Sequence, residues 1–228
     1  MIQKNIIYLV IAVAVLTSCG KIDNYKYPDG DIFGKLTDSI TLDNFQNDQP
    51  NGFSIKLFEK GGNINTPIRF TGKSDGTYEN ALIFQGEYNV LVSEGAFFTQ
   101  DTVRGVKIGA HTELNFTVMP YLAVTNAVVT PSAGKITATY NIKRGRYIAK
   151  ITERKVLVST VPTVNNVVNN FKFQDTNLSK IPDETLLATN FSDVVTGLTS
   201  GVTYYVRIAV RTGTNKYNYS KVFTVTIP

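Results

Sequence analysis

Few side chains in this chain could act as a nucleophile or a general base. Its 228 residues include one histidine, His111, and one cysteine, Cys19. A serine or cysteine nucleophile needs a neighbouring base, and a zinc site needs three or four nitrogen, sulfur or oxygen ligands. No nucleophile-elbow, phosphate-loop or dinucleotide-binding motif occurs. The sequence therefore predicts no cofactor and no metal, and we expect His111 to be a solvent-facing turn residue.

Pairs of carboxylates are the remaining catalytic candidates, because two acids at the right separation can hydrolyse a glycosidic bond. The neighbouring pairs are Asp29 with Asp31 and Asp183 with Glu184. Both pairs fall in segments that we expect to be a tether or a loop, where nothing would hold the carboxylates rigidly. Small β-sandwiches also rarely supply a deep cleft. The sequence therefore predicts a protein without catalytic residues, that is, not an enzyme.

Cys19 ends the stretch LTSC, which follows Lys4 and an apolar run over residues 6–16. That run has the length of a signal-peptide core and is too short for a permanent membrane helix. LTSC matches the bacterial lipobox, in which the cysteine is acylated and cleavage occurs before it. We expect residues 1–18 to be a lipoprotein signal peptide and Cys19 to be the lipidation site that binds the protein to a membrane. The alternative is an ordinary secretory signal with an incidental cysteine.

Residues 19–31 are polar, contain a proline and a glycine, and have no apolar period, so we expect a short tether. Some surface-exposed lipoproteins carry a lysine and then acidic residues directly after the lipidated cysteine. Lys21 fits this export signal, although Ile22 separates it from Asp23. The sequence therefore predicts display at the cell surface.

The charge balance changes sign along the chain. Residues 20–119 contain 9 basic and 13 acidic residues, a net charge of −4, whereas residues 120–228 contain 13 and 5, a net charge of +8. A shift of this kind at Pro120 indicates a domain boundary. A basic half could contact nucleic acid, but no nucleic-acid-binding motif is present, so we expect no such partner.

The first half alternates apolar and polar residues with the period of half-buried strands. In GFSIKLFE, for example, Phe53, Ile55 and Leu57 share one face. Further candidates are DIFGKLTD, IRFTGK, GTYENALIF, GEYNVLVSE and ELNFTVMP, separated by turn signals such as Asp75-Gly76. Six or seven short strands predict an antiparallel β-sandwich over residues 32–119.

The order D-G-x-Y followed by G-x-Y-x-V resembles the transthyretin-like regulatory modules of carboxypeptidases, in which Tyr78 and Tyr88 would be core residues and Asp75 a turn residue. The series PNGF, GKSDGT and EGAFFTQDTV resembles the lipoproteins of domain-of-unknown-function family 3823 (DUF3823). This resemblance implies a transthyretin-like first domain and an immunoglobulin-like second one. It also implies an outer-membrane location beside a TonB-dependent channel and its substrate-binding lipoprotein. It supplies no binding residue.

The second half, residues 120–228, carries the pattern LTSGVTYYVRIAV, in which Leu198 precedes Tyr204 by six residues. This spacing is similar to that of fibronectin type III domains, where the tyrosine hydroxyl bonds to the backbone upstream. The strand candidates KITATYNI, RKVLVST and KVFTVTI alternate as well. The fold class is therefore all-β, with two consecutive antiparallel β-sandwich domains after a lipoprotein signal peptide. The chain lacks Trp, which departs from typical type III members.

Residues 162–190 are rich in asparagine and do not fit a minimal sandwich. We expect an exposed connection with an irregular edge strand, and long loops are also frequent ligand surfaces. Sugar rings stack on aromatic faces, and their hydroxyl groups bond to amides and carboxylates. The candidate ligand-binding residues are Phe97, Phe98, Phe171, Phe173, Tyr205 and Tyr217, with Tyr219, Asn169 and Asn170 as further candidates.

Two functions remain open. The first is a non-catalytic accessory lipoprotein that binds glycan at the cell surface for an outer-membrane carbohydrate-uptake system. The second is a structural or assembly module that contacts the transporter or other envelope proteins through its strand edges. Exposed aromatic residues gathered on one face would favour glycan binding, whereas scattered ones would favour the structural role.

Overall fold

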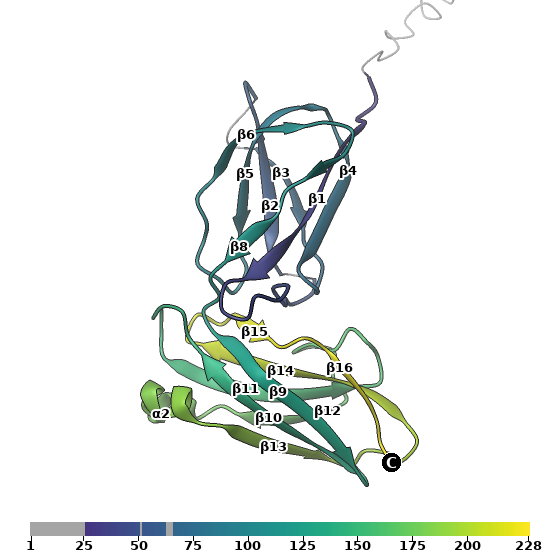
Figure 1. The fold of residues 1–228 in the computed structure, drawn as a ribbon, viewed down its shortest axis with the longest axis vertical. Helices are drawn as coiled ribbons and strands as arrows, with labels where there is room; N and C mark the ends of the chain where they lie inside the picture. The colour runs from purple at the N-terminus through teal and green to yellow at the C-terminus, as the bar shows by residue number, and fades with distance from the viewer. Residues whose placement is uncertain (1–25, 51, 63–65) are drawn as a thin grey trace, which may run out of the picture.

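The structure is a computed structural model that describes residues 26–50, 52–62 and 66–228. Two β-sandwiches follow one another along the long axis, with the start of the described chain at one end and the C-terminus at the other (Figure 1). The expected signal peptide and lipidation site Cys19 lie outside the described residues. Within the described ranges, no helix has the length and apolar character needed to cross a bilayer.

The N-terminal domain consists of two four-stranded sheets. The first sheet contains β1 (Gly30–Asp38), β4 (Thr77–Ile83), β7 (Thr112–Glu113) and β8 (Phe116–Val118). The second contains β2 (Ser54–Glu59), β3 (Ile68–Thr71), β5 (Gly86–Ser93) and β6 (Val103–Ile108). Most neighbours are antiparallel, as the sequence predicts, but β1 pairs with β7 and β8 in parallel. Strand β6, absent from the strand candidates, lies at the edge of the second sheet beside β5.

The core of this domain is formed by the side chains that alternate inward. Phe53 and Ile55 have no exposed surface, and Leu57 has 1%. Tyr78 and Tyr88 are buried and donate their hydroxyl hydrogens to the carbonyls of Leu114 and Phe84. Each such aromatic or aliphatic side chain contributes about 1.5–3 kcal/mol by leaving water. The predicted core role of the two tyrosines is confirmed.

The C-terminal domain also contains two sheets. One has β9 (Ala123–Ser132), β10 (Lys135–Lys143) and β13 (Phe191–Thr196). The other has β11 (Ile151–Ser159), β12 (Phe171–Asp175), β14 (Thr203–Thr212), β15 (Tyr217–Tyr219) and β16 (Phe223–Thr226). The backbone N–H of Thr199 donates to the hydroxyl of buried Tyr204 at 3.1 Å, which confirms the predicted upstream bond of this tyrosine.

The long segment over residues 162–190 is more ordered than its composition suggests. It supplies edge strand β12, which pairs with β11, a short 3₁₀ turn η1 (Leu178–Lys180) and the helix α2 (Asp183–Ala188). The helix was not expected, because six residues are too few to show a helical apolar period. Leu178 and Leu186 hold the segment down by inserting into the core of the C-terminal domain.

Candidate functional site

The two domains are joined by buried polar side chains of the C-terminal domain. Asn218, which is 3% exposed, accepts the backbone N–H of Leu122 at 3.1 Å and donates to the carbonyl of Ala96 at 2.8 Å. Arg207, which is 2% exposed, donates to the carbonyls of Ser220 at 3.0 Å and Ser74 at 3.3 Å. These bonds fix the connection between the domains on both sides of the linker.

The cationic side chains in this interface donate hydrogen bonds to uncharged oxygen atoms. Lys216 donates to the carbonyls of Glu94 and Gly95, and Arg207 has no carboxylate among its hydrogen-bond acceptors. Burial lowers the pKa of the Arg207 guanidinium to about 10, so this group remains charged at neutral pH. Within the described residues, no ion pair joins one domain to the other. The opposite net charges of the two domains therefore form no direct ion pair across the interface.

A cleft of about 760 Å³ lies beside this contact, between the two domains. The N-terminal domain contributes the end of β1 and the loop that follows it. The C-terminal domain contributes the start of β9, the end of β10 and the segment between β15 and β16. The lining residues are Asp38, Ile40, Thr41, Leu42, Asp43, Asn44, Gln46, Val124, Thr125, Asn126, Ala127, Lys143, Tyr219, Ser220, Lys221 and Phe223. Sequence analysis does not predict this cleft, because the cleft forms only where the domains meet.

The loop at residues 38–44 is held in one conformation by Asp38. The Asp38 carboxylate accepts the backbone N–H groups of Ile40 at 2.7 Å and Thr41 at 3.2 Å. Its backbone N–H donates to the carbonyl of Asp43, and its carbonyl accepts the N–H of Leu42, each at 2.9 Å. Burial raises the pKa of Asp38, although the two N–H bonds oppose this effect. Asp38 is therefore a loop-fixing residue rather than a free acid.

Two lining residues have left-handed backbones. Leu42 has φ of 64° and its side chain is 77% exposed, and Asn126 has φ of 51° at the bulge where β9 shifts its register against β10. Asparagine tolerates this conformation, but for leucine it costs roughly 1–2 kcal/mol. Such strain is frequent at functional sites. The strained leucine presents an apolar side chain to solvent at the edge of the cleft.

The chemistry of the cleft suits a ligand with many hydroxyl groups. Amide side chains come from Asn44, Gln46 and Asn126, and exposed charged groups come from Lys143 and Lys221. The lining also includes Asp43, half-buried Phe223 and Thr125, whose Oγ1 is buried without a hydrogen-bond partner. In the described part of the chain, no three His, Cys, Asp or Glu side chains come together as metal ligands.

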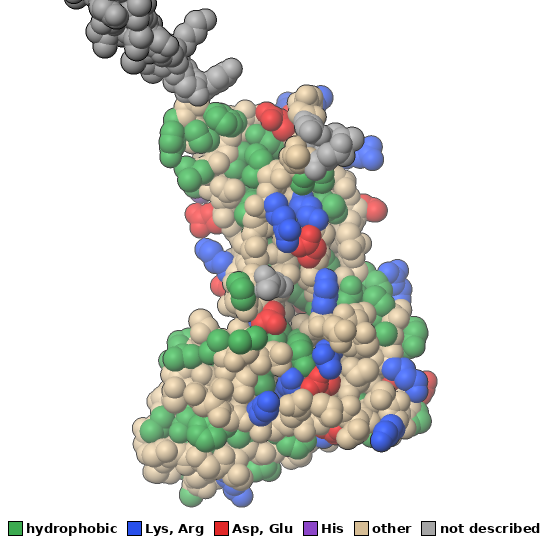
Figure 2. Space-filling view, turned by 180° about the vertical axis from the view of Figure 1, so that it is seen from behind, with side chains coloured by type: hydrophobic (Ala, Val, Ile, Leu, Met, Phe, Trp, Pro, Cys, Tyr) green, Lys and Arg blue, Asp and Glu red, His purple; other side chains and the backbone are tan. Residues whose placement is uncertain are grey.

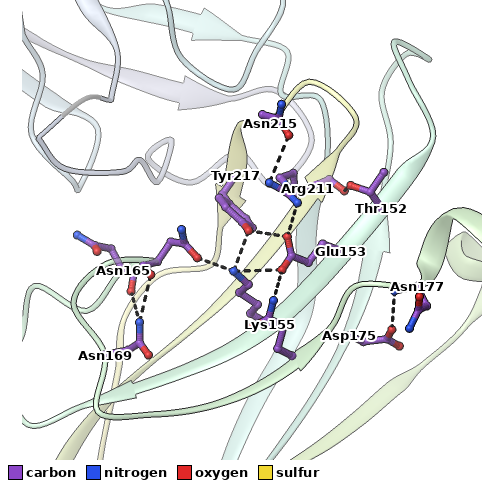
Figure 3. Close-up of polar contacts among 12 residues, drawn as sticks. Thr152, Glu153, Lys155, Asn165, Asn169, Asp175, Asn177, Arg211, Asn215 and Tyr217 are labelled. Carbon is purple, nitrogen blue, oxygen red and sulfur yellow. Dashed lines mark hydrogen bonds and ion pairs between the residues drawn. The ribbon is translucent and has the colours of Figure 1, made fainter.

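A second polar cluster lies on the outer face of the β11–β14 sheet (Figure 3). Lys155 donates to Glu153 at 3.1 Å, to the hydroxyl of Tyr217 at 2.8 Å and to Asn166 at 2.6 Å. The Tyr217 hydroxyl donates to Glu153 at 2.6 Å, and Arg211 lies 2.7 Å from the same carboxylate.

This cluster has little capacity left for a ligand. Glu153 is 2% and Lys155 is 6% exposed. Each carboxylate oxygen of Glu153 contacts two donors, the fourth coming from Gln174 at 2.7 Å. Only Nε of Arg211 is buried without a partner among these charged groups. Burial opposes ionisation of Glu153, but the bonds from Tyr217 and Lys155 outweigh it and lower its pKa. We assign the cluster a structural role.

The aromatic candidates do not gather on one face. Phe97 is wrong as a ligand-stacking residue, because it is 1% exposed and packs edge-on against Phe45 with ring centroids 5.3 Å apart. Phe98 is the outward member of the pair, but it lies under the guanidinium of Arg146 at 3.9 Å.

The other candidates are half-buried. Phe171 and Phe173 lie on β12 and pack against the core of the C-terminal domain. Tyr217 belongs to the structural cluster, and Tyr205 lies with it and buried Tyr219 on the outer face of the same sheet. Among the loop amides, Asn170 bonds to the end of β11, and Asn169 bonds to the carbonyls of its own loop.

Three of the four acidic side chains in the two pairs have a partner. The sequence analysis expects Asp183 to be a loop carboxylate that nothing fixes. It is instead held by Arg144 at 2.8 Å and by the backbone N–H of Ile151 at 3.2 Å. Asp29 pairs with Lys26 at 2.6 Å. His111 is exposed, as predicted, and lies 2.9 Å from Asp31.

The comparisons agree on the architecture. Residues 29–119 match the family model described as "Protein of unknown function (DUF3823) N-terminal domain". No curated protein sequence matches the chain. A DUF3823 family protein from Bacteroides uniformis is 25% identical with a TM-score of 0.71, and one from Parabacteroides merdae is 22% identical with a TM-score of 0.74. Each match covers 88% of this chain and 100% of the other.

A third solved structure, also from Bacteroides uniformis, carries the description "putative carbohydrate binding protein". It is 23% identical, has a TM-score of 0.73, and the match covers 88% of this chain and 100% of that protein. Since the alignments of these structures span both sandwiches, the two-domain arrangement is shared. Residues 29–119 therefore form a DUF3823 N-terminal domain, and the chain shares the two-domain all-β fold of these DUF3823 family proteins.

Proposed function

We propose that this protein is a non-catalytic lipoprotein that binds glycan in the cleft between its two domains. The observation that carries the proposal is the cleft itself, whose amides, hydroxyls and half-buried Phe223 come from both domains. Pyranose rings offer hydroxyl groups at several angles and one apolar face, which this combination of groups can satisfy. The structural relative described as a carbohydrate-binding protein supports this function by analogy of fold.

The proposal also covers location and partners. Acylation of Cys19 would anchor the mature chain in the outer membrane, with Lys21 favouring display at the cell surface. There the protein would present glycan to a TonB-dependent channel and its substrate-binding lipoprotein. Mass spectrometry of the mature N-terminus and protease treatment of intact cells test these two steps.

A panel of purified polysaccharides and oligosaccharides tests the binding function by isothermal titration calorimetry on the mature chain. Lys143→Ala and Lys221→Ala each remove an exposed side chain from the cleft, and we expect each to weaken binding about three- to tenfold through one lost hydrogen bond. Lys135→Ala is the matched control, because Lys135 is exposed at the opposite end of the same strand as Lys143. Equal loss in Lys135→Ala, or binding of no glycan, contradicts the proposal.

The structural or assembly role is the second candidate, and it is supported by the scattered aromatic residues. A protein that only docks to the channel would bind no glycan and would co-purify with the channel from outer membranes. The cleft variants would then leave co-purification unchanged.

A further inference from the structure

Large hydrophobic side chains are exposed at the end of the N-terminal domain where the described chain begins. Tyr27 is 71%, Leu82 63% and Phe84 49% exposed. Figure 2 shows hydrophobic side chains gathered at this end of the molecule, remote from the cleft. We call these three residues the tip patch.

The backbone brings the tip patch together. Gly30 at the start of β1 pairs with Ile83 at the end of β4, so that residues 27–30 lie beside residues 82–85. A Cβ atom at Gly30 would lie 2.8 Å from the carbonyl of Ile83, which shows how close the two segments are. Tyr27 therefore lies near the exposed side chains that flank Ile83.

Charges around the tip patch are balanced. Lys26 pairs with Asp29 at 2.6 Å and Lys60 with Glu87 at 2.9 Å, while the Asp31 carboxylate is hydrogen-bonded to the ring of His111 at 2.9 Å. Lys107 is exposed, and its register partner on β5 is Glu87. A contact made by this end of the molecule would therefore depend on its apolar groups and not on attraction to a charged surface.

The position of Cys19 gives the patch an occupant. Lys26 lies seven positions after Cys19, a span of at most about 25 Å when fully extended. We infer that the tip patch lies against the headgroup region of the lipid membrane that holds Cys19, with the C-terminal domain pointing away from it. This inference rests on the acylation that belongs to the proposed function, but it does not depend on glycan binding.

Three side chains bind a membrane weakly, since each buries little apolar surface. The tether to Cys19 compensates for this weak binding, because a short linker keeps the patch at an effective concentration in the millimolar range near the bilayer. Tyrosine is also suited to the boundary between apolar and wet regions. The contact would fix the orientation of the molecule and hold the cleft above the membrane at the height of one domain.

Amide hydrogen exchange of the acylated full-length mature protein in phosphatidylcholine vesicles tests the inference. We expect exchange over residues 81–85 to be about tenfold slower on vesicles than in the unlipidated Cys19→Ser protein in solution. The variant Leu82→Ser/Phe84→Ser should lose this protection while it stays bound to the vesicles. High salt should leave the protection unchanged, because the contact is apolar.

Residues 192–196 on the far domain are the internal control. Exchange there should not change, and Val128→Ser/Val194→Ser, which replaces two exposed valines of that domain, should keep the protection at residues 81–85. No protection of the tip, or equal protection of residues 192–196, overturns the inference.

A Cys19→Ser chain with an N-terminal histidine tag, held on phosphatidylcholine vesicles by a nickel-chelating lipid, separates this inference from the proposed function. Tip protection in this chain shows that the tip patch binds a bilayer to which the N-terminus is held. If the natural protein then proves to be unacylated, the anchor fails, and with it the contact in the natural protein, although the patch itself binds lipid. An acylated protein without tip protection would overturn the membrane contact of the tip patch and leave the proposed anchor intact.

Discussion

At the scale of single residues, Asp38 controls the loop that forms one wall of the cleft. Asp38 is 8% exposed, and its carboxylate accepts two backbone N–H groups. Because burial raises its folded-state pKa, ionised Asp38 lowers stability as pH rises through the unfolded pKa of about 4 and then through the folded pKa. An uncharged acceptor of the same shape should fix the loop without this cost.

We therefore expect Asp38→Asn to have an unfolding free energy equal to or above that of the wild type at neutral pH. This difference should disappear below about pH 4, where the aspartate is protonated in both states. Asp38→Ala loses both acceptors and should be about 1–2 kcal/mol less stable. Urea denaturation at neutral and acidic pH measures these values, and a marked loss of stability in Asp38→Asn at neutral pH would contradict the interpretation.

Glu153 is the opposite case, because its pKa is lowered in the folded protein. The stability that it supplies is present above its unfolded pKa of about 4.3 and is lost as pH falls through the lower folded pKa. Glu153→Gln leaves the buried ammonium of Lys155 without its carboxylate and should lower the unfolding free energy by about 3 kcal/mol at neutral pH. Chemical denaturation from neutral to acidic pH should show the difference shrinking as pH falls.

The double variant Glu153→Met/Lys155→Met is the control for Glu153→Gln, since it removes both charges and should lose less stability than Glu153→Gln. Glycan binding should persist in both variants if the cluster is structural. Loss of binding with intact folding would reassign it to the ligand site.

At the scale of elements, alternation was a reliable guide to the strands, because one face of each strand must leave water. It identified the strand with Phe53, Ile55 and Leu57 and the strand that starts near Tyr204, all of them buried. Alternation could not give the parallel pairing of β7 and β8 with β1, since direction depends on the path of the chain and not on side-chain period. Nor could it decide that Phe97 rather than Phe98 is buried.

The loop at residues 38–44 gives a prediction at this scale. Leu42→Gly relieves the left-handed backbone of leucine, whose φ is 64°, but adds the entropy cost of glycine in the unfolded chain. We expect an unfolding free energy within about 1 kcal/mol of the wild type or above it. Leu82→Gly is the control, because Leu82 is also exposed but lies in strand β4, where glycine should cost roughly 0.5–1 kcal/mol. Thermal unfolding measures the change in stability of each variant, and a larger loss in Leu42→Gly than in Leu82→Gly would contradict the strain assigned to Leu42.

At the scale of the whole molecule, the candidate site depends on how the domains meet, and this is why the sequence did not indicate it. Tyr205, Arg207 and Arg211 alternate along β14 toward its outer face, where Arg207 is buried by Tyr219 of its own domain and by contact with Ser74 of the N-terminal domain. The cleft residues are ordinary loop and strand-end residues in each domain alone. They become a site because Asn218 and Arg207 fix the distance between the domains.

Asn218→Ala tests this dependence. The change leaves the N–H of Leu122 and the carbonyl of Ala96 without their buried partners, and we expect a loss of about 2–3 kcal/mol in unfolding free energy. It should also loosen the domains, so small-angle X-ray scattering should show a broader distance distribution while each sandwich stays folded. Glycan affinity should then fall although no side chain of the cleft has changed. Asn177→Ala, an exposed site in the same domain, should alter none of these quantities. If Asn218→Ala kept full affinity with visibly separated domains, the ligand would have to bind to one domain alone.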